Sequence, residues 1–108
     1  MKKDIQVIVK RPGEPAAKTI IPNTLKNLQA LVGGYIEVVS LYDHHRPDLV
    51  AIVNEEGRLL GLPHNVRGLV GTIVIAKVKG DDFVGMNDKQ AAELITRVNA
   101  WEGRTVCA

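Results

Sequence analysis

Short runs rich in β-branched residues, each ended by proline, glycine or asparagine, recur along this chain of 108 residues. Runs of this length with such boundaries are typical of β-strands joined by turns. The pattern predicts strands at residues 5–9, 17–21, 35–42, 49–53, 58–62 and 69–78. The run at 69–78 is the longest, and the strand at 35–42 is expected to lie in the middle of the sheet.

Apolar residues recur at helical spacing in two stretches. The first contains Leu25, Leu28, Leu31 and Val32, and the second contains Ala91, Leu94, Ile95, Val98 and Trp101. Asn23 or Thr24 can cap the first helix through a side-chain oxygen. The second helix begins with Asn87 and Gln90, which are spaced as a capping box.

Three glycines have predicted backbone roles. Gly33 should end the first helix in the left-handed conformation, which glycine adopts without steric cost. Gly34 then releases the chain into a strand. Gly57 should supply a positive φ in the turn between residues 49–53 and 58–62.

The predicted order of elements is therefore β-β-α-β-β-β-β-α. This order indicates an α+β fold with a mostly antiparallel sheet and two helices. The chain contains no internal repeat and no long linker, so residues 1–108 are interpreted as a single domain. With 45% hydrophobic residues, a domain of this length can form a core without metals or disulfides.

Charge and composition argue against several classes of partner. Fourteen basic and twelve acidic residues are scattered along the chain, so nucleic acid is not an expected partner. No apolar run approaches the roughly 20 residues of a membrane helix, and the N-terminal stretch lacks the features of a signal peptide. The single cysteine, Cys107, cannot form an internal disulfide. We therefore expect a cytoplasmic protein without a membrane partner.

No catalytic motif is present. Ser40 is the only serine, and it lies in a predicted strand without the glycines of a nucleophile elbow. Asp43, His44, His45 and Asp48 offer metal-ligating atoms, but adjacent histidines have no ligand spacing, so a solvated loop is favoured over a metal site. Neither the P-loop pattern nor the GxGxxG pattern of dinucleotide-binding folds occurs. The protein is expected not to be an enzyme and to need no cofactor or metal.

The most suggestive polar segment spans residues 54–72. Asn54, Arg58, Asn65 and Arg67 lie there among glycines and proline, and such donors can hold phosphate oxygens or the edge of a nucleobase. Tyr35 could add an aromatic face. The sequence thus predicts a ligand site made by these five residues. The alternative is that both arginines simply extend into solvent from loops.

Four segments resemble a known family: LQALVGGYIEVV, VNEEGRLLGLPHN, VGTIVIA and GDDFVGMND, in that order. The family is catalogued as domain of unknown function 3846, and the resemblance covers nearly the whole chain. It implies a short protein of bacteriophages or other bacterial mobile elements, without an established enzymatic signature. The match departs from the family's pattern at Met86 and in the TVCA tail.

Two functions are consistent with this resemblance. The first is a homo-oligomer that binds and sequesters a nucleotide-derived immune signal in the bacterial host cell, such as a cyclic ADP-ribose type molecule or a cyclic oligonucleotide. The second is a protein-interaction inhibitor of a host defence enzyme. The shortage of nucleophiles and bases favours binding over catalysis in both cases.

Overall fold

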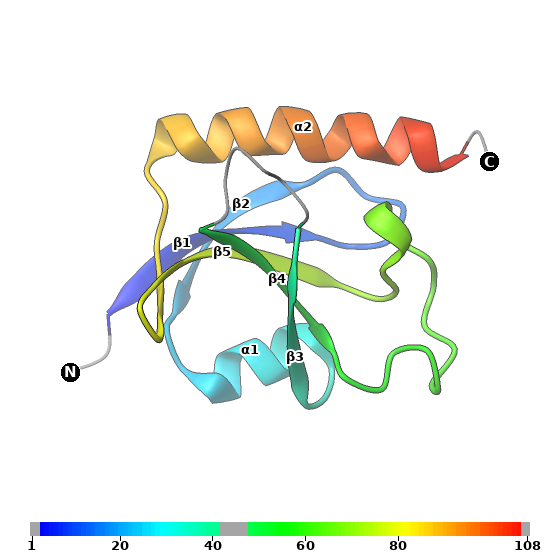
Figure 1. The fold of residues 1–108 in the computed structure, drawn as a ribbon, viewed down its shortest axis with the longest axis horizontal. Coiled ribbons are helices and arrows are strands. Elements are labelled where there is room, and N and C mark those ends of the chain that lie inside the picture. Colours follow the sequence, from blue (N-terminus) through cyan, green and yellow to red (C-terminus); the bar gives the residue numbers. More distant parts are fainter. Residues whose placement is uncertain (1–2, 42–47, 107–108) are drawn as a thin grey trace.

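The computed structural model describes residues 3–41 and 48–106, with side chains up to residue 102. Within them, the elements follow the predicted order β-β-α-β-β-β-β-α (Figure 1). The strands are β1 (Asp4–Lys10), β2 (Ala17–Pro22), β3 (Ile36–Ser40), β4 (Leu49–Asn54), β5 (Ile73–Lys79) and β6 (Asp82–Val84). The helices are α1 (Leu25–Val32), the 3₁₀ turn η1 (Val66–Gly68) and α2 (Asp88–Val106).

All strand pairs are antiparallel, and the sheet has the order β2-β1-β5-β4-β3, with β6 added beside β5. Helix α2 covers one face and α1 covers the other (Figure 1). Strand β5 shows why both faces are apolar: Ile73 and Ile75 pack under α2, whereas Val74 and Ala76 pack against the α1 layer. A strand buried on both faces has a continuous apolar sequence.

The prediction of a strand at residues 58–62 is wrong. This segment forms turns, in which Leu60 N donates to Glu56 O at 2.9 Å and Leu62 N donates to Gly57 O at 3.0 Å. Gly61 has a φ of 68°, which is incompatible with an extended strand. The strand that completes the order is instead β6, whose three residues are too few to show an alternating pattern.

The position of β3 also differs from the prediction. It lies at one end of the sheet, and β5 occupies the central position between β1 and β4. The imperfect alternation of valine and isoleucine with polar residues had been interpreted as that of a covered strand. The residues of β3 are instead half-buried or exposed. The long run at 69–78 contains few charges because the first four residues of β5 are buried.

The helix boundaries are largely as predicted. The hydroxyl of Thr24 accepts a hydrogen bond from Asn27 N at 3.1 Å, which makes Thr24 the cap of α1. Asn87 and Gln90 exchange both bonds of the capping box, at 2.8 and 3.0 Å. Gly33 ends α1 with a φ of 81°.

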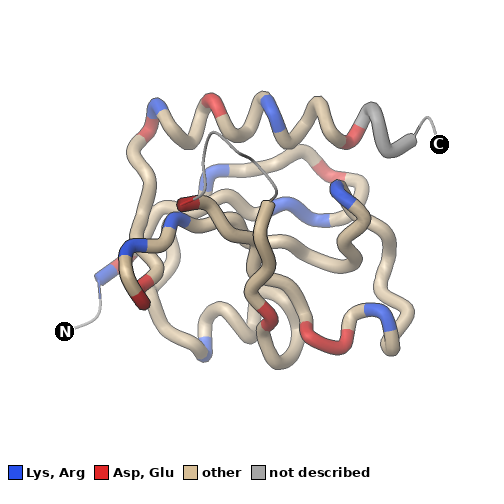
Figure 2. The backbone as a smooth tube through the Cα atoms, in the orientation of Figure 1, with Lys and Arg blue, Asp and Glu red and all other residues tan. Residues whose placement is uncertain are grey.

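Charged residues of both signs are interspersed along the described chain (Figure 2). Lys10 is the exception to surface placement, because its side chain is fully buried. Its ammonium donates to Arg11 O at 2.8 Å and to the Glu102 carboxylate at 3.1 Å. This ion pair ties the end of β1 to α2. Neither described helix is long and apolar enough to cross a membrane.

Candidate binding site

Two consecutive glycines, Gly33 and Gly34, connect α1 to β3. Each position requires glycine for a different structural reason. Gly33 needs its left-handed backbone. Gly34 needs the absence of a side chain, because a Cβ atom there would lie 2.9 Å from the amide nitrogen of Asn54. That nitrogen donates to Val32 O at 3.1 Å, while Asn54 Oδ1 accepts from Glu56 N at 2.8 Å. Asn54 therefore fastens the end of α1 to the turn that follows β4.

A hollow of about 260 Å³ lies at this junction. Its lining combines the glycine pair with polar and apolar side chains: Gln29, Gly33, Gly34, Tyr35, Asn54, Glu56 and Leu60. Tyr35 and Leu60 are large apolar side chains that are nevertheless 68% and 60% exposed. Exposed aromatic and aliphatic groups beside glycine backbone are the surface that a planar ligand can cover. We refer to this as the Tyr35 hollow.

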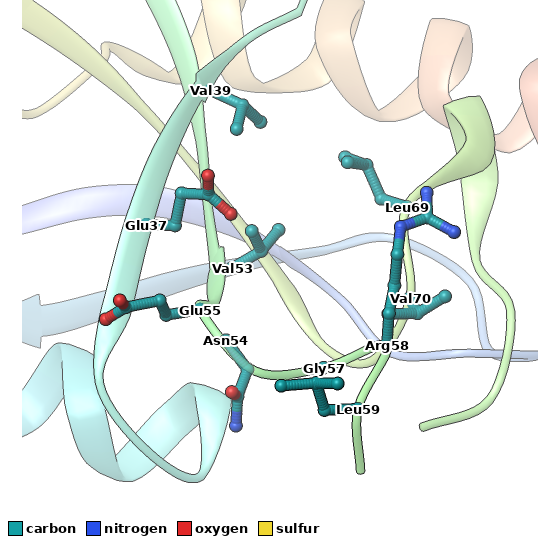
Figure 3. Close-up of a pocket in the computed structure, with 10 residues that line it drawn as sticks. All are labelled: Glu37, Val39, Val53, Asn54, Glu55, Gly57, Arg58, Leu59, Leu69 and Val70. Atoms are coloured by element: carbon teal, nitrogen blue, oxygen red, sulfur yellow. The ribbon is translucent and has the colours of Figure 1, made fainter. Parts of the chain in front are cut away.

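A smaller hollow of about 130 Å³ lies beside the turn at residues 54–60 and shares Asn54 with the Tyr35 hollow (Figure 3). Its apolar lining consists of Val39, Val53, Leu59, Leu69 and Val70. Glu37 enters from β3, and Arg58 stands on the opposite wall. Arg58 is held there by a 2.6 Å hydrogen bond from its guanidinium to Gly68 O.

Asn65 is buried, with 2% of its surface exposed, and each polar atom of its carboxamide has a backbone partner. Its amide nitrogen donates to Lys10 O at 2.9 Å and to Gly71 O at 2.7 Å. Its oxygen accepts from Val66 N at 2.8 Å. These bonds use both amide protons, so this residue joins β1, η1 and the start of β5 from the inside.

Arg67 lies near α2. Its guanidinium is 4.3 Å from the centre of the Trp101 ring and donates to Leu41 O at 3.1 Å. It is the one non-glycine residue of the described chain with a positive φ, at 60°. The ring contact accounts for the guanidinium's orientation.

Of the five predicted site residues, the structure brings Tyr35 and Asn54 to one hollow and Asn54 and Arg58 to the other. Asn65 and Arg67 line neither. Sequence reasoning missed Gln29, Glu56 and Leu60, because helix α1 and the curled turn reach the hollow only after folding. Leu60 in particular had been assigned to the strand predicted at residues 58–62.

Gly57 was expected to have a positive φ, but it is not among the positive-φ glycines. A Cβ atom at Gly57 would instead lie 2.8 Å from Val70 Cγ2. The reason for glycine here is thus close packing beneath the turn rather than backbone handedness.

The charge around both hollows is acidic. Glu56 is the only charged residue among those that line the Tyr35 hollow, and Glu37 and Glu55 outnumber Arg58 in the smaller one. Like charges repel a phosphate at this range unless cations offset them. The arrangement is therefore better suited to an uncharged heterocycle or hydrogen-bond donor than to a phosphate group.

The loop with the two adjacent histidines, considered above as a possible metal site, lies mostly outside the described residues. Asp43, His44 and His45 lie outside the described residues, as does Cys107. Within residues 3–41 and 48–106, no three histidine, cysteine, aspartate or glutamate residues are grouped so that they could hold a metal ion. His64 is exposed, and its backbone forms an isolated bridge with Val70.

The family whose pattern matches is described as a domain of unknown function (DUF3846), and the match spans residues 4–99. The chain belongs to this family. The match includes every strand, α1 and most of α2, so it covers both hollows. Comparisons with curated proteins and with solved structures gave no match.

Proposed function

We propose that this family member is a non-enzymatic binding protein that sequesters a nucleotide-derived bacterial immune signal, holding the signal by its base in the Tyr35 hollow. The observation that carries the proposal is the exposed Tyr35 ring beside exposed Leu60, at the mouth of a hollow whose wall is glycine backbone. A base stacked on an aromatic ring in single-strand nucleic-acid sites contributes about 1–3 kcal/mol.

The polar groups of the hollow suit the edge of a base. The Glu56 carboxylate can accept from the ring N–H or amino group of a base, and the Gln29 carboxamide can both donate and accept. Asn54 is not free for this role, since its carboxamide is engaged with Val32 and Glu56 backbone. In this proposal Asn54 shapes the hollow.

Phosphates would have to lie outside the hollow, because none of the described residues that line it carries a positive charge. Arg58 is the candidate partner for them, since it is on the same turn but faces the smaller hollow. Its bond to Gly68 O would have to break or be shared. We therefore expect Arg58 to contribute less than Tyr35, and expect Arg67 and Asn65 to contribute only through the fold.

Isothermal titration against adenosine, guanosine, cyclic ADP-ribose type molecules and cyclic oligonucleotides tests the proposal. Tyr35→Ala should weaken binding by about tenfold or more, and Tyr35→Phe should retain it, because the ring and not the hydroxyl stacks. Glu56→Gln should shift preference between bases. The ligand should be recovered unaltered, as sequestration requires; a consumed ligand would indicate an enzyme.

A second candidate is a protein-interaction inhibitor of a host defence enzyme. The observation that favours it is Leu59, which is 86% exposed beside exposed Leu60 at the tip of the same turn. Exposed leucines next to each other are frequent in protein contacts. If no small molecule in the panel binds, and Leu59→Asp abolishes inhibition of a purified defence enzyme while Tyr35→Phe does not, this candidate replaces the first.

A further inference from the structure

Strand β3 is an edge strand of the sheet. It pairs with β4 on one side, and no described strand pairs with its other side. Its main contacts within residues 3–41 and 48–106 are with β4 and α1. Val38, in the middle of β3, is 46% exposed although it is β-branched and is followed by Val39. An open edge of this kind can pair with another strand.

The direction of the backbone groups on β3 follows from one hydrogen bond. Glu55 N donates to Tyr35 O at 2.8 Å, so Tyr35 turns its backbone polar groups toward the β4 side. In antiparallel strands this direction alternates from one residue to the next. The backbone N–H and C=O of Ile36 and Val38 therefore point toward the open edge, where a partner strand can reach them.

We propose that a second copy of this chain pairs with this edge, β3 against β3, in an antiparallel register centred on Val38. Residues that lie opposite each other must point their backbone polar groups in the same sense, both into the seam or both away from it, which excludes every register that pairs an even-numbered with an odd-numbered residue. The centred register sets Val38 against Val38 of the second copy. The two valines then exchange two backbone hydrogen bonds across the two-fold axis.

Charge selects this register over the neighbouring one centred on Glu37. A shift by one step of the same parity would centre the pair on Glu37 and set two carboxylates directly opposite each other, which is unfavourable. In the register centred on Val38, Glu37 lies opposite Val39, and Ile36 lies opposite Ser40. The same geometry keeps the α1 faces of the two copies on one side, so the exposed valines cover each other.

The other end of the sheet is protected. Strand β2 contains Lys18 and ends at Pro22, and both residue types discourage edge pairing. Lys18 is moreover tied to Asp88 of α2 at 3.2 Å. Ile20 on β2 is 66% exposed, so it provides a matched β-branched position on the protected edge.

A seam of five residues on each side buries less than the roughly 1,200 Å² of a stable interface, so the dimer should be weak and depend on concentration. Sedimentation from micromolar to millimolar concentration should show a monomer–dimer equilibrium with no added ligand. Val38→Lys should weaken it by about tenfold or more, since two ammonium groups meet at the axis. Ile20→Lys should leave it unchanged. A strict monomer at millimolar concentration, or equal effects of the two variants, would overturn the proposal.

Oxidative cross-linking tests the register in a Cys107→Ser background. The two copies of position 38 lie about 5.5 Å apart between Cα atoms in a hydrogen-bonded pair, which is within disulfide reach. Val38→Cys should therefore form a cross-linked dimer. The two copies of position 37 are diagonal neighbours about 7–8 Å apart, so Glu37→Cys should not. Cross-linking at 37 alone, or at neither position, would overturn the register. Neither experiment requires a ligand, so the dimer and the proposed function can fail separately.

Discussion

The carboxamide of Asn54 occupies the space that a side chain on Gly34 would need, with 2.9 Å between the Asn54 nitrogen and the missing Cβ position. The carboxamide cannot simply move aside, because it is bonded to Val32 O and Glu56 N. Helix α1, strand β3 and the turn after β4 therefore meet at this one contact. Gly34 and Asn54 both line the Tyr35 hollow, so this contact shapes its wall.

Gly34→Ala should consequently lower the free energy of unfolding by about 1–3 kcal/mol, the usual cost of overpacking. Urea denaturation measures this loss. In an Asn54→Ala background the added methyl group has room, so the same substitution should cost much less. Additive costs in this double-mutant cycle would show that the 2.9 Å contact is not the cause.

Gly33→Val should also be destabilising, but through the backbone. Gly33 has a φ of 81°, and nothing lies within 4 Å of its missing Cβ position, so any cost comes from the left-handed conformation. We expect a loss of about 1–2 kcal/mol for valine and a smaller one for asparagine, which tolerates this conformation. Equal stability of the wild type and Gly33→Val in denaturant melts would contradict the assignment.

Local chemistry explains which elements could be predicted. Thr24, Gly33 and the pair Asn87 and Gln90 act on their own neighbours in the chain, so their roles are visible in the sequence. The position of a strand within the sheet depends on pairing with strands that are distant in the sequence. Strand β3 has as many β-branched residues as a buried strand, yet it lies at the edge because nothing described pairs with its outer side.

The candidate site was harder to predict, because a polar residue in a loop has the same appearance whether it points outward or inward. Asn65 and Asn54 both looked like ligand donors, but both are buried and bonded to backbone atoms from distant segments. Leu59 and Leu60 were expected in a strand, but they lie exposed in a turn. Only the tertiary positions of α1 and the turn define the hollow.

Asp88 should make stability depend on pH in the acid range. The hydrogen bond from Gln6, together with the bond and charge of Lys18, lowers the pKa of the Asp88 carboxyl below its ordinary value of 3.8. The folded state thus holds this proton less tightly than the unfolded state. The resulting stabilisation is present above pH 3.8 and is lost as the pH falls through the lower pKa of the folded state.

Urea midpoints measured for the wild type and Asp88→Asn at a series of pH values test this dependence. The advantage of the wild type over Asp88→Asn should be greatest near neutral pH and shrink in strong acid. Asp81→Asn, in the turn before β6, controls for the removal of one exposed carboxylate. An advantage that stays constant with pH would show that the Gln6 and Lys18 contacts do not favour the charged carboxylate.

Arg67 combines an unfavourable backbone with a favourable ring contact, and substitutions can separate the two. Its φ of 60° costs about 1–2 kcal/mol for a residue with a Cβ atom. The contact between the guanidinium and the Trp101 ring stabilises the fold by about 0.5–2 kcal/mol. Arg67→Ala keeps the strained backbone and loses the ring contact, whereas Arg67→Gly loses the contact but relieves the strain. We therefore expect Arg67→Ala to be less stable than Arg67→Gly by about 1 kcal/mol.

Fluorescence distinguishes this structural role from the ligand role predicted from the sequence. Trp101 is the only tryptophan in the chain, so tryptophan emission reports on the surroundings of this ring. Both Arg67 variants should change the emission while leaving any ligand affinity within about twofold of the wild type, because Arg67 lines neither hollow. Arg67→Lys should restore part of the stability, since an ammonium also interacts with the ring but lacks the planar stacking of a guanidinium. Unchanged emission together with lost ligand binding would instead make Arg67 a binding residue.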